Sequence, residues 1–269
     1  MRLLTVLPKS RVAQREKIIS LALGGSVILL FLIGWEILFQ SKIVNPLFIS
    51  APSRVVLAGI TIIKDGTLLH HLGISAREFA LGYGAAVVVG FPIGIILGWF
   101  KLARATFGPF IAAMQATPRI ALMPLFIIWF GLGMTSKIII VLLSAIFPLI
   151  VNLQVAMGTI DADLVQVARS YGATRWQIFR TIALPTSVPF LITGLRLAAG
   201  RGLLGVIVAE VFGGAEGIGY MIQYAGSTFQ TDKVFAGVLV VAVTGITLDV
   251  VLDRLGRHFG KWRSEAAVH

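Results

Sequence analysis

Apolar residues come in long blocks along this chain, separated by short polar segments. Three blocks contain no charged residue, namely Ile18–Trp35, Phe79–Phe100 and Ile138–Ile160. A helix needs about 20 apolar residues to cross a bilayer, and these blocks approach or exceed that length. We therefore predict six membrane-spanning helices, at residues 18–39, 78–100, 106–130, 137–157, 187–211 and 234–253.

The composition agrees with a helical membrane protein. Of the 269 residues, 57% are hydrophobic and only 13% are charged, against about 25% charged residues in soluble domains. The chain has no cysteine, which excludes disulfides, thiolate nucleophiles and cysteine metal sites. The four histidines form no H-x-x-x-H pair. We predict an all-α, polytopic membrane protein without a metal site.

The net charge of +11 indicates a membrane topology rather than a nucleic-acid partner. Lys and Arg concentrate in the cytoplasmic segments of membrane proteins. With the N-terminus in the cytoplasm, the cytoplasmic segments hold Arg2, Lys9, Arg11, Arg15, Lys17, Lys101, Arg104, Arg169, Arg175, Arg180, Arg254, Arg257, Lys261 and Arg263. The opposite side holds Lys42, Arg54, Lys64, Lys137 and Lys233, with Arg77 near the outer end of the second span. Six spans then place both termini on the cytoplasmic side of the membrane.

The segments around the core divide the chain further. Residues 1–17 form a basic N-terminus and residues 18–39 a retained anchor helix, since the apolar run is too long for a signal peptide and no cleavage site follows it. Residues 41–77 form a periplasmic segment, in which 54–72 predicts a helix lying at the membrane interface. Residues 78–253 form the core, with a cytoplasmic loop at 158–186, and 254–269 form a basic tail.

Small residues recur at every fourth position of the second predicted span. Such spacing lets another helix approach closely within lipid. The residues are Gly82, Ala86, Gly90, Gly94 and Gly98, and the fifth span repeats the pattern at Gly194, Ala198 and Gly202. We expect these two spans to pack on each other.

The cytoplasmic loop predicts two short amphipathic helices. Asp161 or Asp163 can cap the first helix, Gly172 suits its end, and Thr174 can cap the second. Pro185 would then turn the chain into the fifth span. The apolar positions follow helical spacing and are Leu164, Val167, Ala168, Tyr171, Ile178, Phe179 and Ile182. A partner protein can bind such a surface; the alternative is a loop that rests on the membrane.

The loop resembles that of permeases from binding-protein-dependent ABC importers. Their motif is E-A-A-x3-G-x9-I-x-L-P, and this chain matches its spacing with Gln166-Val167-Ala168, Gly172, Ile182 and Leu184-Pro185. Gln166 replaces the family's Glu and removes its capacity for an ion pair. The segments resembling the nitrate, sulfonate and taurine subfamily are 118–125, 129–133, 193–198, 208–210 and 217–220.

This resemblance implies the permease fold shared with methionine and molybdate importers, with five core helices and an N-terminal one. It implies a pair of permeases, two ATPase subunits and a periplasmic or lipid-anchored binding protein. The residues implied to couple to the ATPase are Asp163, Gln166, Val167, Ala168, Gly172, Ala173, Ile182, Leu184 and Pro185. No G-x-x-x-x-G-K-[ST] motif is present, so ATP and magnesium would be bound by the partner. We interpret 213–219 as a gating or contact loop, or as a simple turn.

Ionisable residues inside spans are costly and suggest function. We identify Arg119, Arg196, Arg201 and Glu210, with Pro118 beside the first, as candidates for a translocation path. One interpretation is structural, with interhelical ion pairs such as Arg196 with Glu78. The other is that Arg119 or Arg201 lines the path and attracts an anion, since broken helices in transporters line cavities.

The sequence therefore predicts a non-enzymatic permease subunit of an ATP-driven importer, acting as a homodimer on a sulfonate, taurine, nitrate or similar small anion. A heterocyclic vitamin precursor is the alternative substrate within the same machinery. An ion-gradient-driven transporter is the alternative from another class, but it predicts an inverted repeat and midplane carboxylates. A membrane-embedded enzyme would need a cluster of His, Asp or Cys near a membrane face, which the sequence lacks.

Overall fold

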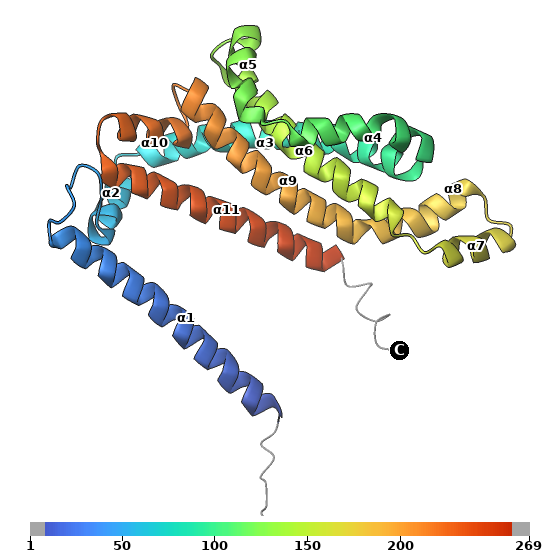
Figure 1. Cartoon of the computed structure of the whole chain (residues 1–269), viewed down its shortest axis with the longest axis horizontal. Coiled ribbons are helices and arrows are strands. Elements are labelled where there is room, and N and C mark those ends of the chain that lie inside the picture. Colours follow the sequence, from blue (N-terminus) through green and yellow to red (C-terminus); the bar gives the residue numbers. More distant parts are fainter. Residues whose placement is uncertain (1–8, 260–269) are drawn as a thin grey trace, which may run out of the picture.

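The computed structural model describes residues 9–259, and this part of the chain is helical throughout apart from short connections (Figure 1). The predicted basic residues at 1–8 and 260–269 lie outside it. The elements are α1 Lys9–Gln40, α2 Pro52–Lys64, α3 Thr67–Trp99, α4 Lys101–Ala116, η1 Arg119–Leu122, α5 Met123–Phe130, α6 Met134–Gly158, α7 Ala162–Ser170, α8 Arg175–Ile178, η2 Phe179–Ala183, α9 Leu184–Gly213, α10 Ile218–Ser227 and α11 Thr231–Phe259. We call the two ends of the bundle the α7 end and the α10 end.

Five helices of the described chain are long and apolar enough to cross a membrane, or six spans if one bent pair counts as a span. That bent pair is the predicted third span, 106–130. It is not one helix: α4 and the η1–α5 segment meet at 84°. Pro118 explains the break, because the residue before a proline is driven out of helical conformation. Thr117 accordingly has φ −67° and ψ 128°, which is extended.

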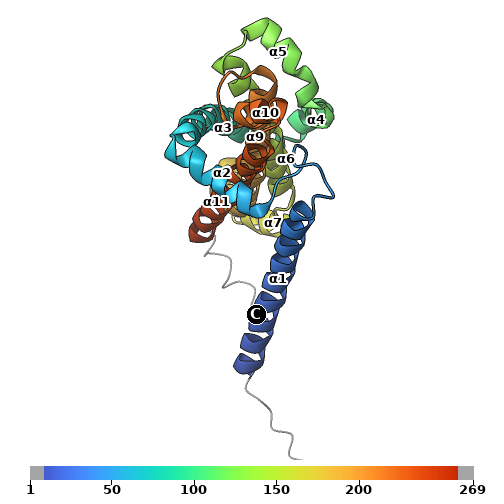
Figure 2. The ribbon, with the colours of Figure 1, turned by 90° about the vertical axis from the view of Figure 1, so that its left-hand side faces the viewer.

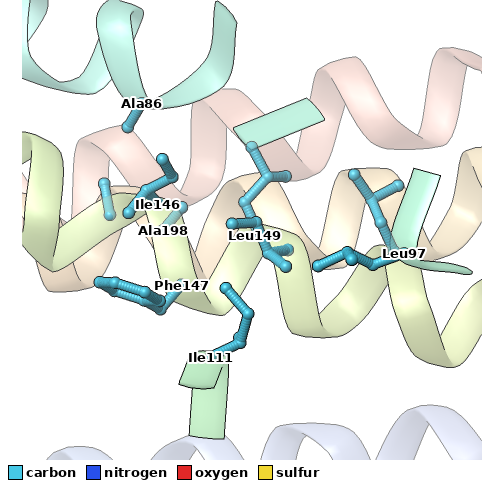
Figure 3. Packing of buried hydrophobic residues seen from close by; sticks show 10 residues of the cluster. Ala86, Leu97, Ile111, Ile146, Phe147, Leu149 and Ala198 are labelled. Carbon is cyan, nitrogen blue, oxygen red and sulfur yellow. The ribbon is translucent and has the colours of Figure 1, made fainter. Parts of the chain in front are cut away.

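The centre of the bundle is α6, which packs against α3 on one side and α9 on the other. Later residues of α3 contact later residues of α6, so these two helices run parallel. Later residues of α9 contact earlier residues of α6, so α9 is antiparallel to α6. Figure 3 shows Ala86 of α3, Ile146 and Leu149 of α6 and Ala198 of α9 meeting in this core. Ile111 of α4 reaches the same cluster.

The small residues of α3 face α6 rather than α9. A Cβ on Gly82 would lie 2.5 Å from Val141 Cβ, and a Cβ on Gly98 would lie 2.5 Å from Met157 Cγ. The stripe on α9 also faces α6, with Gly194 against Asn152. The second and fifth predicted spans do touch, as at Gly202 and Phe79, but their stripes of small residues pack chiefly on α6. Each stripe instead lets its helix approach the central helix closely.

Replacing Gly82 with alanine should destabilise the protein by about 1–3 kcal/mol, because the new methyl overpacks a full interface. It would also meet the Ile138 carbonyl oxygen at 2.8 Å, which a rotamer change cannot relieve. Gly84→Ala is the matched control, since its Cβ has nothing within 4 Å. Thermal unfolding of both variants in detergent measures the effect. Equal melting temperatures for the two variants would contradict the packing argument.

The predicted interfacial helix at 54–72 is divided between two elements. Helix α2 ends at Lys64, and Gly66 turns the chain with φ +79°. Thr67 then begins α3, well before the predicted start of the second span at residue 78. The turn requires a left-handed conformation that glycine adopts without a steric penalty.

Helix α1 diverges from the rest of the molecule, as Figures 1 and 2 both show. The membrane-length part of α1, Ile18–Gln40, buries none of its most apolar window. It is attached only near its end. There Trp35 Nε1 donates a 2.7 Å hydrogen bond to the Ser50 carbonyl oxygen, and the Trp35 ring lies 5.2 Å from that of Phe235.

Candidate functional site

The loop at the α7 end is built by local signals in its own sequence. Asp161 caps α7 by accepting a 2.8 Å hydrogen bond from the Asp163 N–H. Gly172 follows α7 with φ +79°. Thr174 begins α8 with a capping box, in which its hydroxyl accepts from the Gln177 N–H and Gln177 Oε1 accepts from the Thr174 N–H. The first short helix and the capping residues Asp161 and Thr174 are confirmed, whereas the second predicted helix is not a separate short one, since it continues into α9.

The two loop helices differ in what they bury. Ile178 of α8 is buried, and Phe179 of η2 packs edge-on against Trp99 at the end of α3, with ring centroids 5.1 Å apart. These contacts anchor the loop to the bundle. Helix α7 buries no residue in this chain. Its apolar face (Leu164, Val167 and Tyr171, the last 89% exposed) is free in the described structure.

The other predicted coupling residues lie around this face. Ala168 is half-buried on the same side of α7, while Asp163 and Gln166 are exposed. Ala173, Ile182 and Leu184 are half-buried, and Pro185 is exposed.

Pro185 does not turn the chain, contrary to expectation. It is the second residue of α9 and lies just after the π-helical turn η2. The π-helical turn η2 joins α8 to α9, so 175–213 is one continuous helical run.

Arg196 is neutralised by α11. Its Nε and Nη2 donate to Asp249 at 3.0 Å and 2.9 Å, and its Nη1 donates to Asp253 at 2.7 Å. The structural interpretation of an interhelical ion pair holds for Arg196, but its partner is not Glu78. These contacts connect α9 to α11, and they leave Arg196 a weaker candidate for the path.

Glu210 lies in a buried polar network at the α10 end and is 0% exposed. Its Oε2 accepts a 2.7 Å hydrogen bond from the Gly219 N–H, and its Oε1 accepts one of 2.6 Å from the Ser75 hydroxyl. The Ser75 Oγ in turn accepts from the Ile218 N–H at 2.9 Å. Glu210 and Ser75 thus satisfy N–H groups at the start of α10 that a helix cannot satisfy itself. The 213–219 segment is therefore a turn that is hydrogen-bonded to α3 through Ser75 and to α9 through Glu210.

A second buried pair adjoins this network. Lys137 Nζ lies 2.6 Å from Glu78 Oε1, with side chains 6% and 2% exposed. Lys137 also donates to the Glu216 carbonyl oxygen at 3.4 Å. The sequence analysis places Lys137 on the outer side, at the start of the fourth predicted span, and does not identify Ser75. The available signal was that Lys137 directly precedes a charge-free block.

Arg119 and Arg201 lie at a similar level of the bundle, beside α6. The η1 segment carrying Arg119 packs against both α6 and α9, and Arg201 directly precedes Gly202, which faces Ala145 of α6. The guanidinium carbon of Arg119 lies 5.1 Å from the centroid of the Phe147 ring. Pro118 produces the bend that places η1 there. Of the predicted path residues, the fold therefore gathers Pro118, Arg119 and Arg201, and separates Arg196 and Glu210 from them.

Comparison with known proteins assigns the chain. Residues 90–264 match the family model described as "Binding-protein-dependent transport system inner membrane component". The chain is 32% identical to the taurine transport system permease protein TauC of Escherichia coli (strain K12) over 92% of this chain and 91% of that protein. It is 35% identical to the putative aliphatic sulfonates transport permease protein SsuC of Bacillus subtilis (strain 168) over 86% and 83%.

Solved structures agree on the fold. The chain superposes on a chain of the inward-facing MetNI methionine ABC transporter with a TM-score of 0.65 at 18% identity, covering 73% of this chain and 97% of that one. The predicted methionine-importer-like fold is confirmed. This chain accordingly belongs to the inner-membrane components of binding-protein-dependent transport systems and is a multi-pass permease subunit of an ABC importer, whose ATPase is a separate protein.

Proposed function

We propose that this permease works as a homodimer in a bacterial inner membrane and imports a small anion of the sulfonate or taurine class. Two ATPase subunits that bind ATP and magnesium would dock at the α7 end, and a periplasmic or lipid-anchored binding protein would deliver substrate at the α10 end. Both termini would lie in the cytoplasm.

The observation that carries this proposal is the exposed apolar face of α7 on a firmly anchored loop. Leu164, Val167 and Tyr171 would gain from burial in a partner's groove, whereas Phe179, directly after α8, already packs on Trp99 of α3. A loop of this kind both holds a partner and transmits its movement to the bundle. Coupling therefore rests on α7 and on the turn at Gly172.

The orientation is supported by charge. The α7 end of the bundle carries the basic residues Lys101, Arg104, Arg169, Arg175, Arg180, Arg254 and Arg257. Such residues accumulate on the cytoplasmic side of membrane proteins. The α7 end would therefore face the cytoplasm, where ATP is available to the docked ATPase.

A second copy of the chain is supported by the exposed surface of α9. Arg201 is exposed on the middle of this helix, and an arginine facing lipid at that depth is costly. A partner copy facing α9 would replace lipid with a shared, hydrated path.

The substrate class is supported by the TauC and SsuC relatives and by the arginine pair. A neutral heterocyclic precursor offers no negative charge to two guanidinium groups, so the anion is favoured over that alternative. An ion-gradient-driven transporter is not favoured, because the buried carboxylates Glu78 and Glu210 are occupied by Lys137, Ser75 and Gly219.

Purification of the tagged protein from native membranes tests the importer assembly. We expect a P-loop ATPase to copurify and uptake of labelled taurine or an alkanesulfonate by the reconstituted complex to require ATP. Uptake by the permease alone, driven by an ion gradient and with no copurifying ATPase, would contradict the proposal.

A further inference from the structure

Arg201 is an uncompensated charge deep in the membrane. At 1.5 Å per residue, it lies about 18 Å along α9 from the α10 end and about 26 Å from the start at Leu184. Its side chain makes no hydrogen bond or ion pair within residues 9–259. It is exposed on the same face of α9 as Leu197 and Leu204. The cost of such a charge needs an explanation.

Arg119 is only partly satisfied at a similar depth. Its Nη2 donates long hydrogen bonds of 3.3 Å and 3.5 Å to the carbonyl oxygens of Gln115 and Met114, at the end of α4. Its Nε is buried and has no partner in the described structure. The ring of Phe147 covers one face of the guanidinium. Phe147 lies about 20 Å along α6 from Met134 and about 16 Å from Gly158.

No carboxylate of the membrane helices is left to neutralise these two arginines. Asp249 and Asp253 bind Arg196, Glu78 binds Lys137, and Glu210 accepts from Ser75 and Gly219. Two further acidic residues of the membrane helices are also occupied: Glu36 accepts from Ser53, and Asp232, at the start of α11, binds Arg54. Two cations with open donors, and with no counter-charge within residues 9–259, are therefore suited to bind an anion from outside the chain.

We propose that Arg119 and Arg201 form a transient binding subsite for the oxyanion head group of the transported substrate. Guanidinium groups bind planar and tetrahedral oxyanions through paired charge-assisted hydrogen bonds. Phe147 fixes the plane of Arg119, and the bend at Pro118 brings η1 to α9. The inference rests on the proposed function and adds the residues that hold the substrate within the path.

A lipid phosphate has the same chemistry but is the less suitable ligand. Head groups lie about 15 Å from the middle of a hydrocarbon core about 30 Å thick, whereas the two arginines lie near its middle. A substrate on the path reaches this depth, and a head group would have to leave its interface to do so.

The absence of cysteine from the chain gives a direct test. In proteoliposomes of the full importer, Arg201→Cys should reduce uptake of a labelled alkanesulfonate by about tenfold or more, the loss of one charge-assisted contact. Treatment with aminoethyl methanethiosulfonate restores a positive charge at residue 201 and should recover a large part of the uptake. Methyl methanethiosulfonate adds a neutral group and should recover none. Excess substrate should slow the modification of this cysteine, and added anionic lipid should not.

Matched variants separate the outcomes. Lys101→Gln removes an exposed charge at the α7 end and should transport like wild type, whereas Arg119→Gln should resemble Arg201→Cys. If the wild-type complex imports the sulfonate, any of three results would overturn the subsite alone. These are undiminished uptake by Arg201→Cys, equal rescue by the neutral reagent, and protection of the cysteine by lipid rather than by substrate. A wild-type complex that imports no sulfonate would overturn the proposed function, and the subsite with it.

Discussion

Lys137→Met is expected to destabilise the protein by about 3–5 kcal/mol, the usual cost of removing one partner from a buried ion pair. Lys137 and Glu78 face each other across the α3–α6 interface, and both side chains are almost completely buried. Methionine fills similar space but leaves the Glu78 carboxylate without its cation. The second oxygen, Glu78 Oε2, already has no hydrogen-bond partner in the described residues. Thermal unfolding of the purified variant in detergent measures the loss.

The double variant Lys137→Met with Glu78→Gln provides the control. It removes both charges, so the desolvation penalty of an orphaned carboxylate disappears. We expect the double variant to be more stable than Lys137→Met alone, a reversal that simple loss of packing volume would not produce. If the second substitution only adds to the damage, the pair is not what stabilises this end of the bundle.

Ala168→Asp is expected to abolish ATP-driven uptake while the permease still folds and inserts. Ala168 is half-buried at the edge of the face formed by Leu164, Val167 and Tyr171, and a carboxylate enclosed there by a docked ATPase would lack a partner. The control is Ala162→Asp, which adds the same group to the opposite face at the first turn of α7. A negative charge is favourable at that end of a helix, so Ala162→Asp should transport normally.

Gly172→Pro should have the same effect for a different reason. The residue has φ +79°, which the proline ring, fixed near −65°, cannot adopt. The turn between α7 and α8 must then change and move the docking face. Copurification of the ATPase together with uptake in proteoliposomes measures both variants. Normal uptake by either of them would show that α7 does not couple transport to ATP.

Features set by neighbouring residues could be predicted from the sequence. The caps at Asp161 and Thr174 and the turn at Gly172 each depend on a few residues nearby, and the apolar blocks marked the long helices. The sequence also showed the stripe of small residues, but it did not show which helix packs on the stripe. The spacing of small residues indicates that some helix approaches closely, and it does not say which one.

Features set by the meeting of distant helices could not be predicted. Arg196 binds Asp249 and Asp253 only because α9 and α11 are antiparallel in one particular register. Lys137 is buried because Glu78, 59 residues earlier, faces it. The 84° angle after α4 could not be predicted, because it depends on the packing of η1 against α6 and α9.

The unbroken helix from Arg175 to Gly213 has a mechanical consequence. A helix of this length can cross the bilayer as one stiff element, with Trp176 near its α7 end and Glu210 near its α10 end. The close packing against α6 keeps this helix from sliding along it. A displacement of the α7 end by the proposed ATPase would therefore tilt α9 and its packed neighbours together, as one block. Reorientation of the pathway would then come from rocking of two such blocks against each other, with little rearrangement inside either.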